Sequence, residues 1–214
     1  MSDSPAKTSR GGSSGDSRTD EQLIAAYCAG DKEGFAQLVA RYERELFHFL
    51  YRFLGDRAAA EDVFQEAFLQ VHLSATTFDA KRRFKPWLFT IAANKGRDYL
   101  RSASRRATMP LEAAISPSDE ESGRFVDMMK SAELVPGVDL EAAEERERVR
   151  EVVMRMPENL REVLLLSYFH QFPYGQIGEI LNIPLGTVKS RLHAAVAMFA
   201  SRWAEIQQNR RGGR

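Results

Sequence analysis

Apolar residues recur at helical steps in two blocks of this chain, and no segment shows a convincing strand pattern. In the first block, residues 20–106, bulky apolar side chains follow three or four positions apart, as from Phe35 through Leu38 to Tyr42. The second block, residues 140–206, keeps the same period. Apolar residues at this spacing line one face of an amphipathic helix. The sequence therefore predicts an all-α protein built from two small helical domains.

The stretch between the two blocks has a different composition. Residues 107–139 are rich in Pro, Gly and Ser, and they hold seven acidic residues against two basic ones. Because this stretch lacks sustained periodicity, we expect an acidic flexible linker with one short helix around Arg124 to Glu133. Residues 1–19 are expected to form a disordered tail, and residues 207–214 a basic C-terminal tail.

The composition excludes several classes of function. Cys28 is the only cysteine, so an internal disulfide and a cysteine-rich metal site are ruled out. The N-terminus has no apolar signal region, and no apolar run is long enough to cross a membrane, so we expect a cytoplasmic protein. No phosphate loop or nucleophile motif occurs, which predicts no catalytic residue, no metal, no cofactor and no small-molecule substrate. The four histidines lie far apart without metal-ligand spacing: His48, His72, His170 and His193.

Positive charge gathers in one aromatic-containing segment, although the chain is neutral with 30 basic and 30 acidic residues. Residues 81–106 hold nine Lys or Arg and one acid, Asp98. Cations mixed with aromatic rings on which bases can stack are typical of single-strand nucleic-acid binding. The candidate residues lie on a basic loop and on one stripe of the helix after that loop: Phe78, Lys81, Arg82, Arg83, Lys85, Trp87, Thr90, Asn94, Arg97 and Arg101. The alternative is a solvated basic helix face, with Trp87 in the core and Asn94 in a buried helix-to-helix hydrogen bond.

The C-terminal block predicts a helix-turn-helix. A first helix over Tyr174 to Leu181 ends at Asn182, which can adopt the left-handed conformation that closes a helix. The helix from Pro184 onward places apolar residues on one stripe and a polar, basic face outward, as expected of a helix that enters the major groove. The core stripe is Val188, Leu192, Ala195, Val196 and Phe199; Thr187, Lys189, Ser190 and His193 point away from it, and Arg191 lies at its edge. An ordinary antiparallel helix pair is the alternative.

A helix over about Ala58 to Leu73 has acids and leucines together on its outer face. The outer residues are Asp62, Gln65, Glu66, Leu69 and Leu73, opposite a core stripe of Ala60, Phe64, Ala67, Phe68 and Val71. Such a mixed face suits a partner helix with basic groups around an apolar seam. Alternatively, Leu73 turns inward at the helix end and leaves Leu69 as a lone exposed leucine, which is common.

Three segments, in this order, resemble one bacterial family. They are EDVFQEAFLQVH, then FKPWLFTIAANKGRDYLR, then MPENLREVLLLSYFHQFPYGQIGEILNIPLGTVKSRLHAA. This order is similar to that of the extracytoplasmic-function (ECF) group of RNA polymerase sigma factors, which have helical regions two and four on a flexible linker. The resemblance implies region two at 20–106 and region four at 140–206.

The family resemblance implies a role for each surface. Asp62, Gln65, Glu66 and Leu69, here called the docking surface, would bind the clamp helices of the polymerase beta-prime subunit, with the beta subunit as a further partner. The loop and stripe from Phe78 to Arg101, here called the minus-ten surface, would hold the melted minus-ten element with one base flipped out. Thr187, Lys189, Ser190, Arg191 and His193, here called the recognition surface, would read the minus-thirty-five duplex. An anti-sigma factor is an expected regulator.

Two other functions fit parts of the pattern. A sigma mimic would sequester an anti-sigma factor without binding DNA, but it would not need the intact basic segment. A helix-turn-helix repressor working without polymerase is disfavoured by the neutral overall charge and the acidic outer helix.

Overall fold

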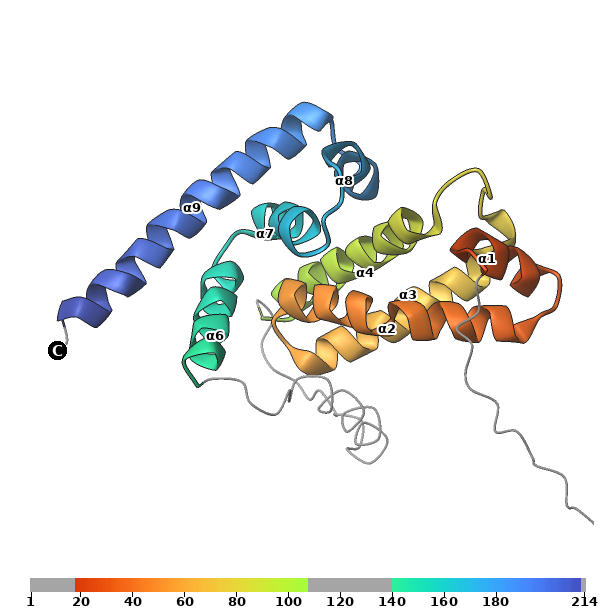
Figure 1. Ribbon diagram of the computed structural model, residues 1–214, viewed down its shortest axis with the longest axis horizontal. Coiled ribbons are helices and arrows are strands. Elements are labelled where there is room, and N and C mark those ends of the chain that lie inside the picture. Colours follow the sequence, from red (N-terminus) through yellow and green to blue (C-terminus); the bar gives the residue numbers. More distant parts are fainter. Residues whose placement is uncertain (1–17, 108–139, 213–214) are drawn as a thin grey trace, which may run out of the picture.

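The structure is a computed structural model that describes residues 18–107 and 140–212, and every regular element in these ranges is helical (Figure 1). This confirms the all-α class. The first unit contains α1 (Asp20–Cys28), α2 (Lys32–Leu54), α3 (Arg57–Ser74), the short 3-10 turn η1 (Ala75–Thr77) and α4 (Phe84–Ala107). The second unit contains α6 (Leu140–Met154), α7 (Glu158–Leu164), the π-helical turn η2 (Leu165–Phe169), α8 (Tyr174–Leu181) and α9 (Leu185–Gly212). The predicted linker helix lies outside the described residues.

Local capping chemistry sets the helix ends. The Asp56 carboxylate accepts a hydrogen bond from the Ala59 backbone N–H at 2.7 Å, which caps the start of α3. Gly55 ends α2 with a φ of 80°, a conformation that glycine adopts without steric cost. Asn182 ends α8 with φ 53° and ψ 51°, the left-handed conformation expected from the sequence. These caps fix where each helix stops and so which residues lie in the loops.

The core of the first unit is aromatic. Phe49, Phe53, Phe84 and Phe89 are completely buried, and the predicted inner stripe of α3 is buried throughout. Helices α1 and α2 cross closely at Gly34, where a Cβ atom would lie 2.6 Å from the Leu23 carbonyl oxygen. A side chain at this crossing would push the two helices apart.

The second unit buries the inner faces of α8 and α9. Ile177, Ile180 and Leu181 pack against Val188 and Leu192, which confirms the predicted helix-turn-helix core. Val196, expected on the same stripe, is 39% exposed, so that part of the prediction is wrong.

The two units pack against each other. Helix α8 lies on α4, and η2, α6 and α7 lie on α2. The sequence contains no local signal for this contact, because periodicity identifies an apolar face but not its partner.

Candidate nucleic-acid and polymerase interfaces

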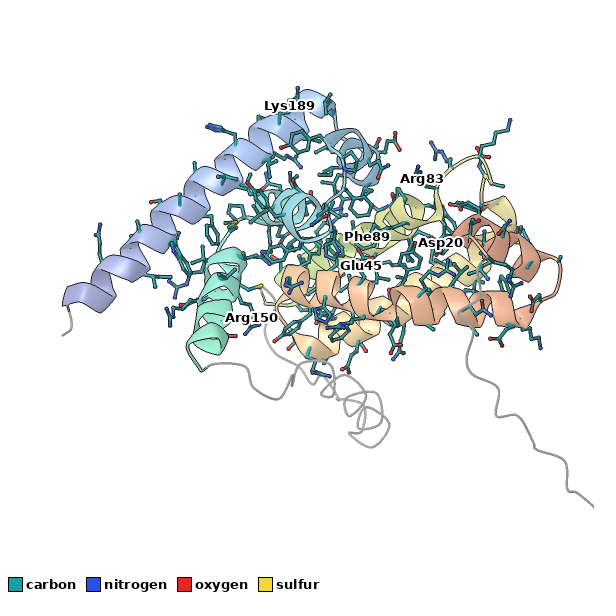
Figure 2. The ribbon with its side chains drawn as sticks, viewed as in Figure 1. Asp20, Glu45, Arg83, Phe89, Arg150 and Lys189 are labelled. Atoms are coloured by element: carbon teal, nitrogen blue, oxygen red, sulfur yellow. The ribbon has the colours of Figure 1, made fainter. Side chains whose placement is uncertain are left out.

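The basic loop before α4 is exposed and borders a hollow. Lys81, Arg82 and Arg83 point into solvent, and Arg83 lies at the edge of the loop in Figure 2. The hollow is about 540 Å³ and is lined by Thr19, Asp20, Glu21, Arg41, Tyr42, Ala80, Lys81, Arg82, Arg83 and Lys85. An open, cationic hollow of this size can hold a single unstacked base.

Two carboxylates of α1 position this loop. The Glu21 carboxylate accepts a hydrogen bond from the Phe84 backbone N–H at 3.0 Å, which fixes the start of α4. The Asp20 carboxylate accepts hydrogen bonds from the Tyr42 hydroxyl and the Arg41 guanidinium. Burial and the Asp20 contact raise the pKa of Tyr42 well above its usual range, so its hydroxyl stays a donor. These supporting residues were not predicted from the sequence, because they lie outside the basic segment.

The aromatic residues of the loop pack on each other. Phe78 lies 4.8 Å from Trp87 and 5.9 Å from Phe84, measured between ring centroids. Phe78 and Trp87 are each half-buried, so each ring keeps an accessible part. Trp87 therefore has both a core side and a surface side.

The stripe along α4 is only partly available to a ligand. Asn94 and Arg101 are exposed, so the alternative of a buried Asn94 is wrong. Arg101 pairs with Asp98 at 2.8 Å, and Arg97, which is half-buried, donates a hydrogen bond to Asn94 at 2.5 Å. The Thr90 hydroxyl donates to the Pro86 carbonyl oxygen at 2.9 Å and is thus already engaged.

Lys85 lies at the contact between the units and keeps 34% of its side chain exposed. Its ammonium group is 2.7 Å from the Glu45 carboxylate and 5.2 Å from the centre of the Phe172 ring. His170 is the second partner of Glu45, at 3.2 Å. Burial alone would raise the pKa of Glu45, but the contacts with His170 and Lys85 outweigh burial and hold that pKa below its usual value.

The start of α9 presents a polar outer face. Lys189, Ser190 and His193 are exposed, and Lys189 lies at the outer end of the helix in Figure 2. Thr187 is half-buried, and its carbonyl oxygen accepts a hydrogen bond from the Ser190 hydroxyl at 3.1 Å. The cationic end of this helix can approach a DNA backbone and place short polar side chains at base edges.

Arg191 turns back toward a buried carboxyl group on α7. Glu162 is 2% exposed, and its Oε1 lies 3.5 Å from Arg191, while its Oε2 lies 3.7 Å from Arg97 of the first unit. Burial raises the pKa of Glu162, and the two guanidinium groups only partly oppose that rise. Glu162 was not among the residues predicted from the sequence.

The outer face of α3 is exposed, as expected. Leu69 is 57% exposed and Leu73 is 65% exposed, so the alternative in which Leu73 turns inward is wrong. Asp62 and Gln65 are exposed, and Glu66 pairs with Lys95 of α4 at 3.4 Å. Two leucines surrounded by acidic groups form a surface that neither unit covers.

Within the described ranges, no group of three or more His, Cys, Asp or Glu side chains could hold a metal ion. The described helices include none long and apolar enough to cross a membrane.

Comparisons with known proteins give matches in both units. The family descriptions "Sigma-70 region 2" and "Sigma-70, region 4" match residues 38–106 and 146–198. The ECF RNA polymerase sigma factor SigW of Bacillus subtilis is 32% identical over 77% of this chain and 86% of its own length. The chain belongs to the ECF family of RNA polymerase sigma factors. The ECF sigma-E factor of Escherichia coli K12 is 31% identical over 83% of this chain and 90% of that protein.

Two solved structures share the fold. The structure of CnrH in complex with the cytosolic domain of CnrY has a TM-score of 0.62 at 23% identity, and covers 87% of this chain and 97% of that chain. The sigma factor RpoE of Bartonella quintana, in complex with the anti-sigma factor NepR, has a TM-score of 0.59 at 20% identity. The match covers 79% of this chain and 96% of that chain. Membership in the family defines the function: this ECF sigma factor binds core RNA polymerase and directs it to promoters to start transcription.

Proposed function

We propose that the three surfaces divide the work of promoter recognition among them. The minus-ten surface holds the melted non-template strand and takes one base into the hollow beside Arg83. The recognition surface reads the minus-thirty-five duplex, and the docking surface binds the beta-prime clamp helices. The observation that supports this division is the difference in charge between the surfaces: Lys81, Arg82, Arg83, Arg101 and Lys189 are exposed on the loop, α4 and α9, whereas acids and leucines share the outer face of α3.

The proposed chemistry is binding rather than catalysis. The loop cations neutralise phosphates and release counterions, which gives affinity that does not depend on sequence. The half-buried rings of Phe78 and Trp87 offer faces on which unpaired bases stack. Nucleotide addition belongs to the polymerase, and this chain acts beside it in the cytoplasm without a catalytic site of its own.

An anti-sigma factor is the proposed regulator. The fold neighbour from Bartonella quintana was solved with such a partner. By analogy, a cognate anti-sigma factor would cover the minus-ten and recognition surfaces of this chain and release them on a signal.

The division of surfaces is tested with four single variants in purified holoenzyme. Arg97→Ala and Lys189→Ala should weaken promoter binding and transcript yield while leaving the affinity for core polymerase unchanged. Asp62→Arg and Leu69→Asp should lower core affinity instead. An equal loss of core binding in all four variants would disprove the division, and a sigma mimic would give no promoter-dependent transcript at all.

A further inference from the structure

The hollow beside the basic loop is lined by two elements that are separate in the sequence. The loop contributes Lys81, Arg82 and Arg83, whereas Arg41 and Tyr42 come from the middle of α2. Arg41 lies outside the basic segment at 81–106 and belongs to none of the three surfaces defined above. A ligand in this hollow would therefore meet a cation that the sequence did not indicate.

The Arg41 side chain is held in one direction. Its guanidinium donates hydrogen bonds to the Asp20 carboxylate and, at 3.1 Å, to the Arg18 carbonyl oxygen. The Asp20 carboxylate also accepts a hydrogen bond from the hydroxyl of Tyr42, which is buried. Figure 2 labels Asp20 beside the loop that carries Arg83, and both residues line the hollow. An arginine that is ordered before its ligand arrives loses less conformational entropy on binding.

Arg41 also keeps hydrogen-bonding capacity for a ligand. A guanidinium carries more N–H donors than its contacts with Asp20 and Arg18 use. The Arg41 side chain is 36% exposed, whereas that of Asp20 is 18% exposed. The carboxylate partner thus lies deeper than the guanidinium, and the remaining donors of Arg41 are accessible from solvent at the edge of the hollow.

The charges around the hollow favour an anionic group. Its lining holds five cationic side chains and two carboxylates: Arg41, Lys81, Arg82, Arg83 and Lys85, with Asp20 and Glu21. A base that enters the hollow brings its own phosphate to the edge. The planar fork of an arginine can bind two phosphate oxygens at once, in a geometry that a lysine does not offer. Arg41 is therefore suited to the phosphate, while the loop surrounds the base.

We propose that Arg41 of α2 is a DNA-binding residue, which binds the backbone phosphate next to the base held in the hollow. The melted strand is then gripped from two elements, by α2 at the phosphate and by the loop at the base. This inference rests on the proposed function, because it requires a base in the hollow. The alternative is that Arg41 only fastens the start of α1 through Asp20 and Arg18.

The salt dependence of DNA binding tests the phosphate contact. Holoenzyme assembled from the full chain binds a single-stranded minus-ten oligonucleotide, and fluorescence anisotropy measures the affinity at several salt concentrations. One phosphate contact contributes about 0.7 to the slope of log affinity against log salt. Arg41→Gln should lower the slope by about that amount and weaken binding about fivefold near 0.1 M salt. Arg41→Lys, which restores the charge, should restore the slope.

The matched control is Arg44→Gln, which removes the same charge from an exposed position of α2 that does not line the hollow. It should keep both the slope and the affinity of the unmodified chain. An unchanged slope in Arg41→Gln, or an equal loss in the two variants, would overturn the proposal. Urea unfolding shows the alternative role: a lower midpoint in Arg41→Gln with unchanged DNA binding would make Arg41 a structural residue only.

Oligonucleotides with one neutral methylphosphonate each locate the contact. At one position, the neutral group should weaken binding by the unmodified holoenzyme about fivefold and that by Arg41→Gln no further, because one contact cannot be lost twice. This position should adjoin the nucleotide at which removal of the base weakens binding most. The absence of such a position, or its occurrence elsewhere in the oligonucleotide, would disprove the assignment.

A scrambled oligonucleotide of the same length separates this inference from the proposed function. If the unmodified holoenzyme binds both sequences equally, the minus-ten surface itself is disproved, and the role of Arg41 falls with it. If the unmodified holoenzyme prefers the minus-ten sequence but Arg41→Gln behaves like Arg44→Gln, the proposed function stands and only the phosphate contact of Arg41 is disproved.

Discussion

At the scale of single residues, cationic side chains have different roles at different sites. Arg83 and Lys189 extend into solvent, whereas Arg161 is 7% exposed and donates hydrogen bonds to three carbonyl oxygens, of Phe53, Met154 and Met156. A solvated cation is available to phosphate, but one that satisfies buried backbone groups serves the fold. Residue type alone does not separate these roles.

Lys189→Ala is expected to weaken promoter binding by the holoenzyme. The loss of one good base contact costs about 1–3 kcal/mol, equivalent to a roughly 5- to 150-fold lower affinity. Filter binding at several salt concentrations measures it. Arg202→Ala, on the same helix in an exposed pair with Glu205, is the control and should keep the affinity within about twofold. Equal losses in the two variants would contradict a specific role for Lys189.

The contributions of two carboxyl groups to stability should change with pH in opposite directions. Because burial raises the pKa of Glu162, the folded chain holds that proton more tightly than the unfolded chain, and its contribution to stability falls as pH rises above about 4.3. Burial would also raise the pKa of Glu45, but the contacts with His170 and Lys85 lower it overall. The Glu45 contribution is therefore present above about pH 4.3 and is lost as pH falls through the lower folded pKa.

Urea unfolding of Glu162→Gln and Glu45→Gln between about pH 3.5 and 7.5 checks both signs. Relative to the unmodified chain, the free energy of unfolding of Glu162→Gln should improve as pH rises. The free energy of unfolding of Glu45→Gln should instead fall relative to the unmodified chain over the same rise in pH. Parallel curves for all three proteins would show that neither group titrates differently on folding.

At the scale of helices, close crossings depend on small side chains. Gly34→Ala should lower the free energy of unfolding by about 1–3 kcal/mol, because the new Cβ would lie 2.6 Å from a backbone oxygen of α1 that cannot move independently. Gly175→Ala in α8 is the matched control, since nothing lies within 4 Å of its added Cβ. Urea unfolding should show no loss for the control. An unchanged free energy of unfolding in Gly34→Ala would mean that α1 shifts freely on α2.

The helices could be predicted from sequence because their signals are local. The Asp56 cap, the left-handed Asn182 and the inner stripe of α3 depend on residues a few positions apart. The outer leucines of α3 were predicted from the helical period, and the exposed loop cations from the local concentration of Lys and Arg. Glu45 and Glu162 could not be found in this way, because their partners are distant in sequence and meet only when the units pack.

At the scale of the whole molecule, Arg161 connects the units and also supports the end of α6 within its own unit. Arg161→Met should lower the free energy of unfolding by about 2–3 kcal/mol, because three buried carbonyl oxygens lose their donor. Arg155→Met, an exposed neighbour paired with Glu151, should cost less than about 0.5 kcal/mol. Urea and calorimetric unfolding measure both variants. Similar losses would contradict a special role for the buried guanidinium.

The π-helical turn η2 makes the packing of the second unit sensitive to the loss of a single residue. Here the His170 N–H reaches back five positions to the Leu165 carbonyl oxygen at 3.2 Å, so the turn holds more residues than an ordinary helical turn. Removing one residue would restore regular winding and rotate the next part of the chain by about 100°. The imidazole would then swing away from the Glu45 carboxylate, and a single-codon deletion in a turn that carries no proposed DNA contact would change how the second unit packs on the first.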